Sequence, residues 1–358
     1  MNSGRRRVPL RLGLVVSFLI SALWMSCTSA DDTLREQAGK FFSPLPRQMQ
    51  SPQNPITPEK VALGKILFYE TRVSVDKTVS CARCHPFSRY AADGLTKSIG
   101  NNCRVNPRNA PTILNAAAQI SSHWIGNRTG VEDQAKQAVI GPPSFGMPTY
   151  EAVEKELNAI KGYGPLFNKA FPNDKDPVTV DNFAMAIGAF ERTLVTPSLF
   201  DAFMKGDKTA LDGAEKTGLK KFMDAGCVGC HSGAYLGGQM YQKFGKLAPY
   251  WQYTGSATID EGRYTVTKDE NDKYVFKVPV LRNVAMTSPY FHDGSVDRLP
   301  DAVRVMGKIQ LEKDLSDQEI SAIVVFLKSL TGHLPDDAIT VPILPSGEVE
   351  LRPIVVRP

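Results

Sequence analysis

Two copies of one short pattern, C-x-x-C-H, constrain this chain more than any other feature of its sequence. The copies read Cys81-Ala82-Arg83-Cys84-His85 and Cys227-Val228-Gly229-Cys230-His231. In such a motif the two thiols add across the vinyl groups of a haem, and the adjacent His lies beneath the iron. A zinc site would need its ligands at finger-like spacing, and a thioredoxin-type pair needs no following His. We therefore predict two covalently bound c-type haems, attached by Cys81, Cys84, Cys227 and Cys230 and ligated by His85 and His231.

The first thirty residues have the organisation of a secretory leader. Four Arg residues between positions 5 and 11 precede an apolar run over 12–25, and small residues follow at 28–30. The run is too short to cross a bilayer core of about 30 Å as an uncleaved anchor, and the residues before Cys27 match a lipoprotein signal poorly. We predict a signal peptide over 1–30, cleaved near Ala30. A periplasmic location follows, because haem is attached to such motifs outside the bacterial cytoplasm.

Without this leader the chain carries almost no net charge. Four of its 42 Lys and Arg residues, and none of its 37 Asp and Glu residues, lie in 1–30. A nucleic-acid-binding surface normally shows a strong basic excess, so we expect no nucleic-acid partner. No second segment is apolar enough to span a membrane, so no stable membrane span is predicted.

The length of 358 residues suggests about two domains, and helical patterns recur in both halves. A helix is predicted to begin at Thr57, because Thr57-Pro58-Glu59 supplies a cap, a first-turn Pro and an acidic residue ahead of the first motif. Leu211 to Met223 repeats this pattern ahead of the second motif. Closing helices are predicted over 181–194 and after Ser316, where Ser316-Asp317-Gln318-Glu319 forms a capping box.

Strand signals are few in this sequence. Residues 264–266 and 274–278 are predicted to form one hairpin around Asn271-Asp272. The predicted fold is therefore mainly α, with two cytochrome c-like haem domains and little β structure. We expect an N-terminal domain over 31–195, a C-terminal domain over 196–340 and an extended tail over 341–358.

Two haems do not by themselves make an enzyme. An iron with both axial positions filled passes electrons, whereas catalysis needs an open iron. Met is the natural sixth ligand for the second haem, and Met240, Met286 and Met306 all follow His231. Their spacing does not choose among them.

Several separate blocks, in the same order, resemble the bacterial di-haem cytochrome c peroxidases, a family that includes the methylamine-utilisation maturase-like enzymes. The resemblance covers nearly all of the chain after the leader. The blocks lie at 80–85, 93–94, 98–100, 109–115, 132–135, 276–279, 281–283 and 289–294.

This resemblance implies two sets of metal ligands. Met306 is then the axial ligand of the second, electron-transfer haem. Asn109 and the backbone carbonyls of Thr287 and Pro289 are then a calcium site between the haems, and such oxygen ligands suit that ion. The alternative role for Asn109 is a capped turn before Pro111.

The resemblance also implies a reaction. Trp124 would lie between the haems, and Gln134 on the distal side of the first, peroxidatic haem. Hydrogen peroxide would be reduced there, with electrons that a small exported c-type cytochrome or copper protein delivers through the second haem. A homodimer is the usual assembly in this family.

The chain departs from the family around the first haem. In the resembling enzymes a distal His follows Ser-Ile-Gly, but here Asn101 stands there, and an amide is a poor iron ligand. We therefore expect a five-coordinate or water-bound first haem. The family's distal Glu, just before a Met, is replaced by Gly146. His123 could compensate as an acid/base group, but it could also ligate the iron or be a structural His.

We also predict roles for Arg282 and Cys103. Arg282 should pair with a haem propionate, because guanidinium suits carboxylate, and Cys103 should be a free thiol. Three functions stay open at this stage: a peroxidase, a maturase-like oxidase acting on a partner protein, and a di-haem electron carrier without catalysis. The second is disfavoured by Met306, because the maturases have a Tyr ligand there.

Overall fold

The computed structural model describes Met1 and residues 30–346, so the predicted leader and positions 347–358 of the predicted tail lie outside the described residues. The described part is mostly helical, which confirms the predicted fold class. No helix within 30–346 is long and apolar enough to cross a membrane.

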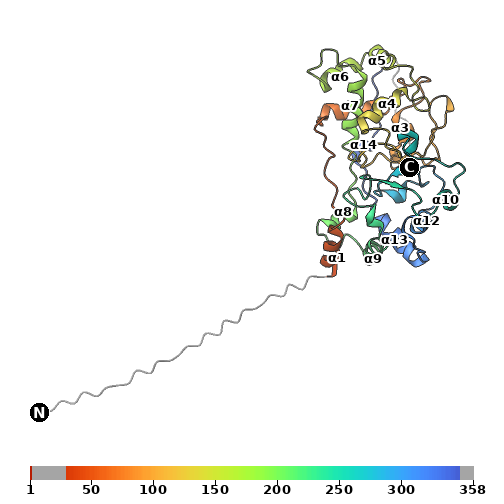
Figure 1. Ribbon diagram of the computed structural model, residues 1–358. Helices are drawn as coiled ribbons and strands as arrows, with labels where there is room; N and C mark the ends of the chain where they lie inside the picture. The colour runs from red at the N-terminus through yellow and green to blue at the C-terminus, as the bar shows by residue number, and fades with distance from the viewer. Residues whose placement is uncertain (2–29, 347–358) are drawn as a thin grey trace.

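The helices and strands fall into two halves of the chain, and Figure 1 shows most first-half helices in its upper part and most second-half helices in its lower part, with the first and last helices as exceptions. The first half holds α1 (Ala30–Gly39), α2 (Pro58–Phe68), α3 (Cys81–Cys84), α4 (Val131–Ile140), α5 (Tyr150–Ala159), α6 (Tyr163–Ala170) and α7 (Val180–Glu191). The second half holds α8 (Leu199–Met204), α9 (Gly213–Asp224), β1 (Tyr241–Lys243), α10 (Trp251–Thr254), α11 (Tyr264–Thr267), β2 (Val275–Lys277), α12 (Leu299–Leu311), α13 (Asp317–Ser329) and α14 (Asp336–Ile339). Short 3-10 helices lie at Phe87–Arg89, Asn101–Cys103, Cys227–Gly229, Glu270–Asp272 and Val284–Met286.

The helices begin where side chains cap them. The Thr57 hydroxyl accepts a hydrogen bond from the backbone of the first turn of α2, as predicted. Ser316 and Glu319 form the predicted capping box of α13. A further capping box at Asp212 starts α9. Each cap satisfies backbone N–H groups that have no partner within the helix.

One close helix crossing occurs in each half. A Cβ atom on Gly64 of α2 would overlap the carbonyl oxygen of Ala186 in α7, and a Cβ on Gly218 of α9 would overlap that of Ala322 in α13. The absence of a side chain therefore lets both helix pairs approach backbone to backbone. The two crossings show that the halves repeat one packing pattern.

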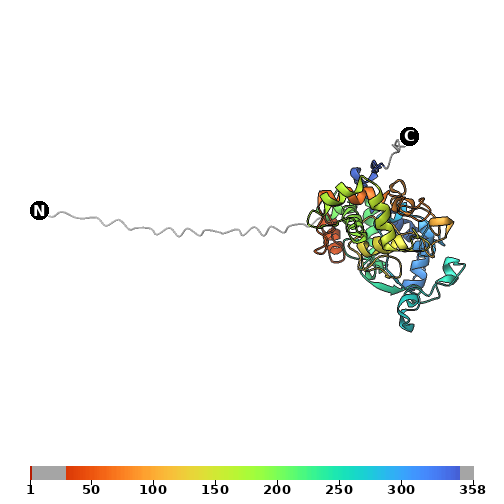
Figure 2. The ribbon, with the colours of Figure 1, turned by 90° about the horizontal axis from the view of Figure 1, so that it is seen from above.

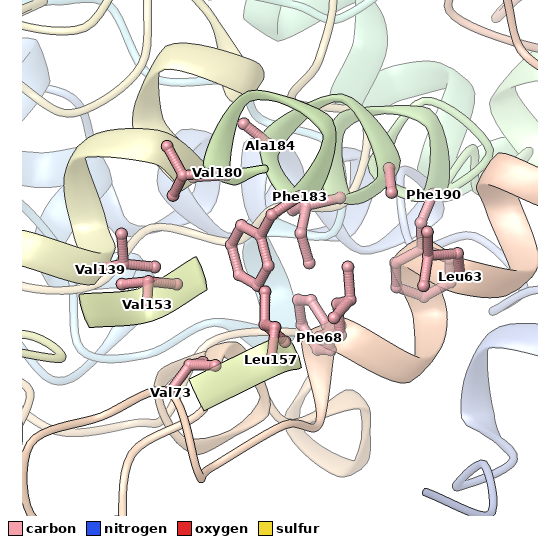
Figure 3. Packing of buried hydrophobic residues seen from close by; sticks show 14 of the residues in the cluster. Leu63, Phe68, Val73, Val139, Val153, Leu157, Val180, Phe183, Ala184 and Phe190 are labelled. Atoms are coloured by element: carbon pink, nitrogen blue, oxygen red, sulfur yellow. The ribbon is translucent and has the colours of Figure 1, made fainter. Parts of the chain in front are cut away.

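Each crossing is part of a separate apolar core. Figure 3 shows the first core, where Leu63 and Phe68 of α2 meet Phe183 and Phe190 of α7 and Leu157 of α5. The second core gathers side chains mainly between positions 200 and 330, from α8, α9 and α13. The two cores meet near the predicted boundary at residue 195. That the two halves are separate domains stays a prediction.

The ends of the described chain pack across that boundary. Ala38 of α1 and Phe42 belong to the second core, although the sequence places them in the first half. Ala338 of α14 belongs to the first core, and α14 lies beside first-half helices in Figure 2. The limits expected for the two domains are therefore wrong at their outer ends.

The predicted hairpin is also wrong. Residues 264–267 form α11, and β2 pairs instead with β1 in an antiparallel register that places Tyr241 opposite Lys277. The Asp269 side chain accepts a hydrogen bond from the backbone of Asn271 and starts a tight 3-10 turn. Such local side-chain bonds compete with a hairpin turn.

We expect the two crossings to fail when either Gly gains a side chain. G64A and G218A should each lower the free energy of unfolding by about 1–3 kcal/mol, because the added methyl group forces the helices apart. G213A is the matched control, since a Cβ there meets nothing within 4 Å and Ala favours a helix. Thermal or urea unfolding of the three variants measures this, and equal stability of all three would contradict it.

Candidate functional site

A single cavity of about 560 Å³ joins the two C-x-x-C-H motifs. All six motif residues predicted to hold haem line it, although the motifs are far apart in the sequence. The cavity also brings together most of the other predicted site residues, namely Asn109, His123, Trp124, Gln134, Thr287, Pro289 and Met306. The described residues therefore form one site from segments of both halves.

The two motif histidines are held in the same way. Nδ1 of His85 lies 3.1 Å from the carbonyl oxygen of Ala91, and Nδ1 of His231 lies 3.1 Å from that of Leu236. Because a carbonyl only accepts, Nδ1 carries the proton and Nε2 keeps its lone pair, as an iron ligand requires. Burial lowers the pKa of His85 and lowers that of His231 to about 4, which keeps both rings neutral.

The cavity fits two haems by further observations. Cys81, Cys84, Cys227 and Cys230 form no disulfides. Among the lining atoms, Ser98 Oγ and Arg128 Nε are buried without a hydrogen-bond partner in the described protein. Unpaired buried polar atoms are costly, so a large group with its own polar atoms is expected to fill the space.

Met306 is the one methionine of the three candidates that lines this cavity. It lies on α12, whereas Met240 and Met286 do not reach the cavity wall. The spacing after His231 did not choose among the three methionines, but the structure places Met306 alone at the cavity. Ligation of the second iron by Met306 stays a prediction.

His123 lines the cavity, and only one of its two ring nitrogens is hydrogen-bonded to a described residue. Its Nδ1 lies 2.9 Å from Asn127 Oδ1, and Nε2 makes no hydrogen bond with any described residue. Burial lowers the pKa of His123 to about 4, so the ring is neutral at pH 7. Its backbone has φ +66, an uncommon conformation for a residue with a side chain. A satisfied structural His does not need these features.

Trp124 and Asn109 are linked by hydrogen bonds. The Trp124 indole donates to the Asn109 carbonyl oxygen at 3.0 Å, and Asn109 Nδ2 donates to the Leu95 carbonyl oxygen at 2.8 Å. Asn109 Oδ1 therefore stays available as an acceptor, and Thr287 and Pro289 line the same cavity.

Comparison with known proteins agrees with this geometry. The family model described as di-haem cytochrome c peroxidase matches residues 58–209. The cytochrome c551 peroxidase of Pseudomonas aeruginosa is 42% identical over 325 residues, which cover 90% of this chain and 93% of that protein. This chain belongs to the di-haem cytochrome c peroxidase family.

Other relatives show the breadth of the family. The methylamine utilization protein MauG of Methylorubrum extorquens is 33% identical over 339 residues, covering 89% of this chain and 93% of that protein. The crystal structure of a MauG-like protein associated with microbial copper homeostasis matches with a TM-score of 0.75 and 27% identity, over 83% of this chain and 97% of that one. The predictions of an oxidoreductase of the peroxidase class and of two c-type haems are confirmed by family membership.

Asn101 and Gly146, where this chain departs from the family's distal residues, are neighbours in space, but neither lines the cavity. Asn101 is fully buried, and its Nδ2 donates to the carbonyl oxygens of Pro142 and Ser144 at 2.6 and 2.9 Å. A Cβ on Gly146 would overlap this amide. The Asn101 amide thus joins two loops, and the expectation of a five-coordinate or water-bound first haem stays a prediction.

The expected propionate partner, Arg282, is also placed elsewhere. Its guanidinium donates to both carboxylate oxygens of Asp201, at 2.6 and 3.0 Å, and to Ser198 and the Ala234 carbonyl oxygen. These bonds use all five of its N–H donors. Arg282 is buried and does not line the cavity, so the prediction of a propionate contact is wrong.

Sequence reasoning assigned no role to the charged residues of the cavity wall, two of which are buried. Glu191, 4% exposed at the end of α7, is the single carboxylate among the described lining residues. Burial raises its pKa to about 8. Lys277, 7% exposed in β2, also lines the cavity. In the sequence each stands directly after an aromatic residue of an apolar run, Glu191 after Phe190 and Lys277 after Phe276. A charge at such a position is the sign that could have revealed them.

We predict that Arg282 acts on stability. R282Q should lower the free energy of unfolding by about 3–5 kcal/mol, because it leaves the Asp201 carboxylate buried without its cation. The control is R298Q, which removes an exposed partner of Asp301 and should cost less than about 1 kcal/mol. Urea unfolding of the two holoproteins compares them, and similar small losses would show that the buried pair is unimportant.

Glu191 should make stability depend on pH. Its pKa of about 8 lies above the value near 4.5 of an unfolded Glu, so the folded state holds an extra proton between these values. The stability that this proton contributes is complete below about pH 4.5 and is lost as the pH rises towards 8. E191Q should therefore lose less stability than wild type between pH 5 and 8 in unfolding measurements. The exposed-residue control E36Q should follow the wild-type curve, and a parallel E191Q curve would refute the prediction.

Proposed function

We propose that this protein reduces hydrogen peroxide to water at the haem of the first motif, with electrons from a small exported cytochrome c or copper protein. The second haem passes these electrons on, with Met306 as its axial ligand. The proposal includes action in the periplasm after removal of residues 1–30, and a calcium ion bound by Asn109 Oδ1 and the carbonyls of Thr287 and Pro289.

The observation that carries the proposal is the asymmetry of the shared cavity. The cavity lining includes Met306 of α12, and the proposal assigns its thioether to the second iron because such a ligand suits electron transfer. The other lining residues include His123 and Gln134 but no further methionine among those described. An iron without a protein ligand on its distal face can accept a small oxidant, the state that the proposal assigns to the first haem, and when bound the haems supply the redox chemistry.

In this proposal His123 moves the proton that peroxide cleavage requires. Its Nε2 lone pair can accept a proton, while the bond between Nδ1 and Asn127 Oδ1 fixes the ring. The low pKa keeps this nitrogen unprotonated at neutral pH. Gln134 is proposed to orient peroxide by hydrogen bonding. Such acid–base help typically contributes about 10²–10⁴-fold in rate.

The test is peroxide-dependent oxidation of a reduced small cytochrome c by the purified di-haem protein. Wild type should turn over, and H123F should lower kcat by about 10²–10⁴-fold. H333F is the matched control, because His333 is exposed and lies outside the cavity wall.

The possible failures of this test differ in meaning. No turnover by wild type would favour an electron carrier, or a MauG-like oxidase with a protein substrate. Turnover that H123F leaves unchanged would show that another group moves the proton. A ferric spectrum with two fully low-spin haems would refute the open first iron.

A further inference from the structure

The cavity wall contains more positive than negative charge. Its cations among the described residues are Arg108, Arg128 and Lys277, and Glu191 is its one carboxyl group. Arg108 is neutralised outside the cavity, since its guanidinium makes two bonds to the Asp260 carboxylate at 2.7 and 2.9 Å. Neither Arg128 nor Lys277 forms an ion pair with an Asp or Glu among the described residues.

Lys277 is a buried cation that lacks a carboxylate. Its Nζ donates to the neutral side chain of Gln119, and its backbone N–H donates to the Trp124 carbonyl oxygen at 2.7 Å. No described Asp or Glu pairs with it, and burial lowers its pKa to about 7. A buried ammonium group without a counter-charge is unfavourable.

Arg128 provides a second unsatisfied donor at the same cavity. Its Nη1 donates to the Asn127 carbonyl oxygen at 2.7 Å, while its Nε is buried without any partner. Arg128 ends the loop that begins at Ser122. Arg128 therefore lies on the loop that carries His123 and Trp124, and Lys277 is bonded to it.

We propose that Lys277 and Arg128 bind haem propionate carboxylates in the region between the two motifs. Each haem brings two carboxylates into the cavity, which supply the counter-charge that both residues lack. Carboxylate oxygens would complete the donors of Arg128 and the ammonium group of Lys277, as charge-assisted hydrogen bonds. The pair takes the role that the sequence suggested for Arg282.

This inference rests on the two haems and not on peroxidase activity. Its test therefore uses readouts that do not involve turnover. A cation beside a haem favours the reduced iron, so its removal should lower the midpoint potential. Loss of a hydrogen bond should also shift the propionate bending band in the resonance Raman spectrum.

The experiment compares holoprotein variants by spectroelectrochemical titration at pH 6, below the pKa of Lys277. K277Q and R128Q should each lower the midpoint potential of at least one haem and shift its propionate band. K277R, which keeps the charge, should stay close to wild type. K243Q is the matched control, because Lys243 lies on the paired strand β1 but is exposed, where solvent screens its charge.

Unchanged potentials and an unchanged propionate band in K277Q and R128Q would overturn the proposal. If K277Q yields no holoprotein, R128Q carries the test, because Arg128 is only half-buried. Altered potentials in a variant that has no peroxide turnover would still support the proposal.

Discussion

The backbone contact of Gly64 with α7, repeated by Gly218 with α13, is the constraint on which both haem sites depend. Residue Cys227 follows α9 within three positions, so the α9–α13 crossing fixes where the second motif starts. In the first half, α7 leaves its crossing and carries Glu191 into the cavity wall. One packing rule, used twice, therefore brings the second haem motif and a buried carboxyl group from the first half to the same cavity.

The chemical difference between the two sites comes from the segments that close the cavity, not from the crossings. Helix α12 brings a thioether to one side, and the loop over 122–128 brings an imidazole to the cavity. The same loop is held by a bond from the Trp124 indole to the Asn109 carbonyl oxygen and by a backbone bond from Lys277 of β2. A shared scaffold thus supports two irons with different surroundings, since axial groups and nearby charge set what a haem does.

The parts of the structure that the sequence predicted well have local causes. The haem motifs, the cap at Thr57 and the capping box at Ser316 each involve residues within a few positions. The pairing of β2 with β1 and the bond from Arg282 to Asp201 join distant segments, and the sequence predicted a different partner in each case. The resemblance gave the position of Asn101 in the sequence but not the direction of its side chain, which bonds to the Pro142 carbonyl oxygen.

The crossed packing of the chain ends affects how the molecule can move. Because α1 is held by the second core and α14 by the first, the halves cannot swing apart about their linker without exposing apolar side chains from both ends. Domains that meet only at a linker and a small interface hinge more freely. We expect this mutual fastening to keep the spacing of the two irons nearly constant through a redox cycle.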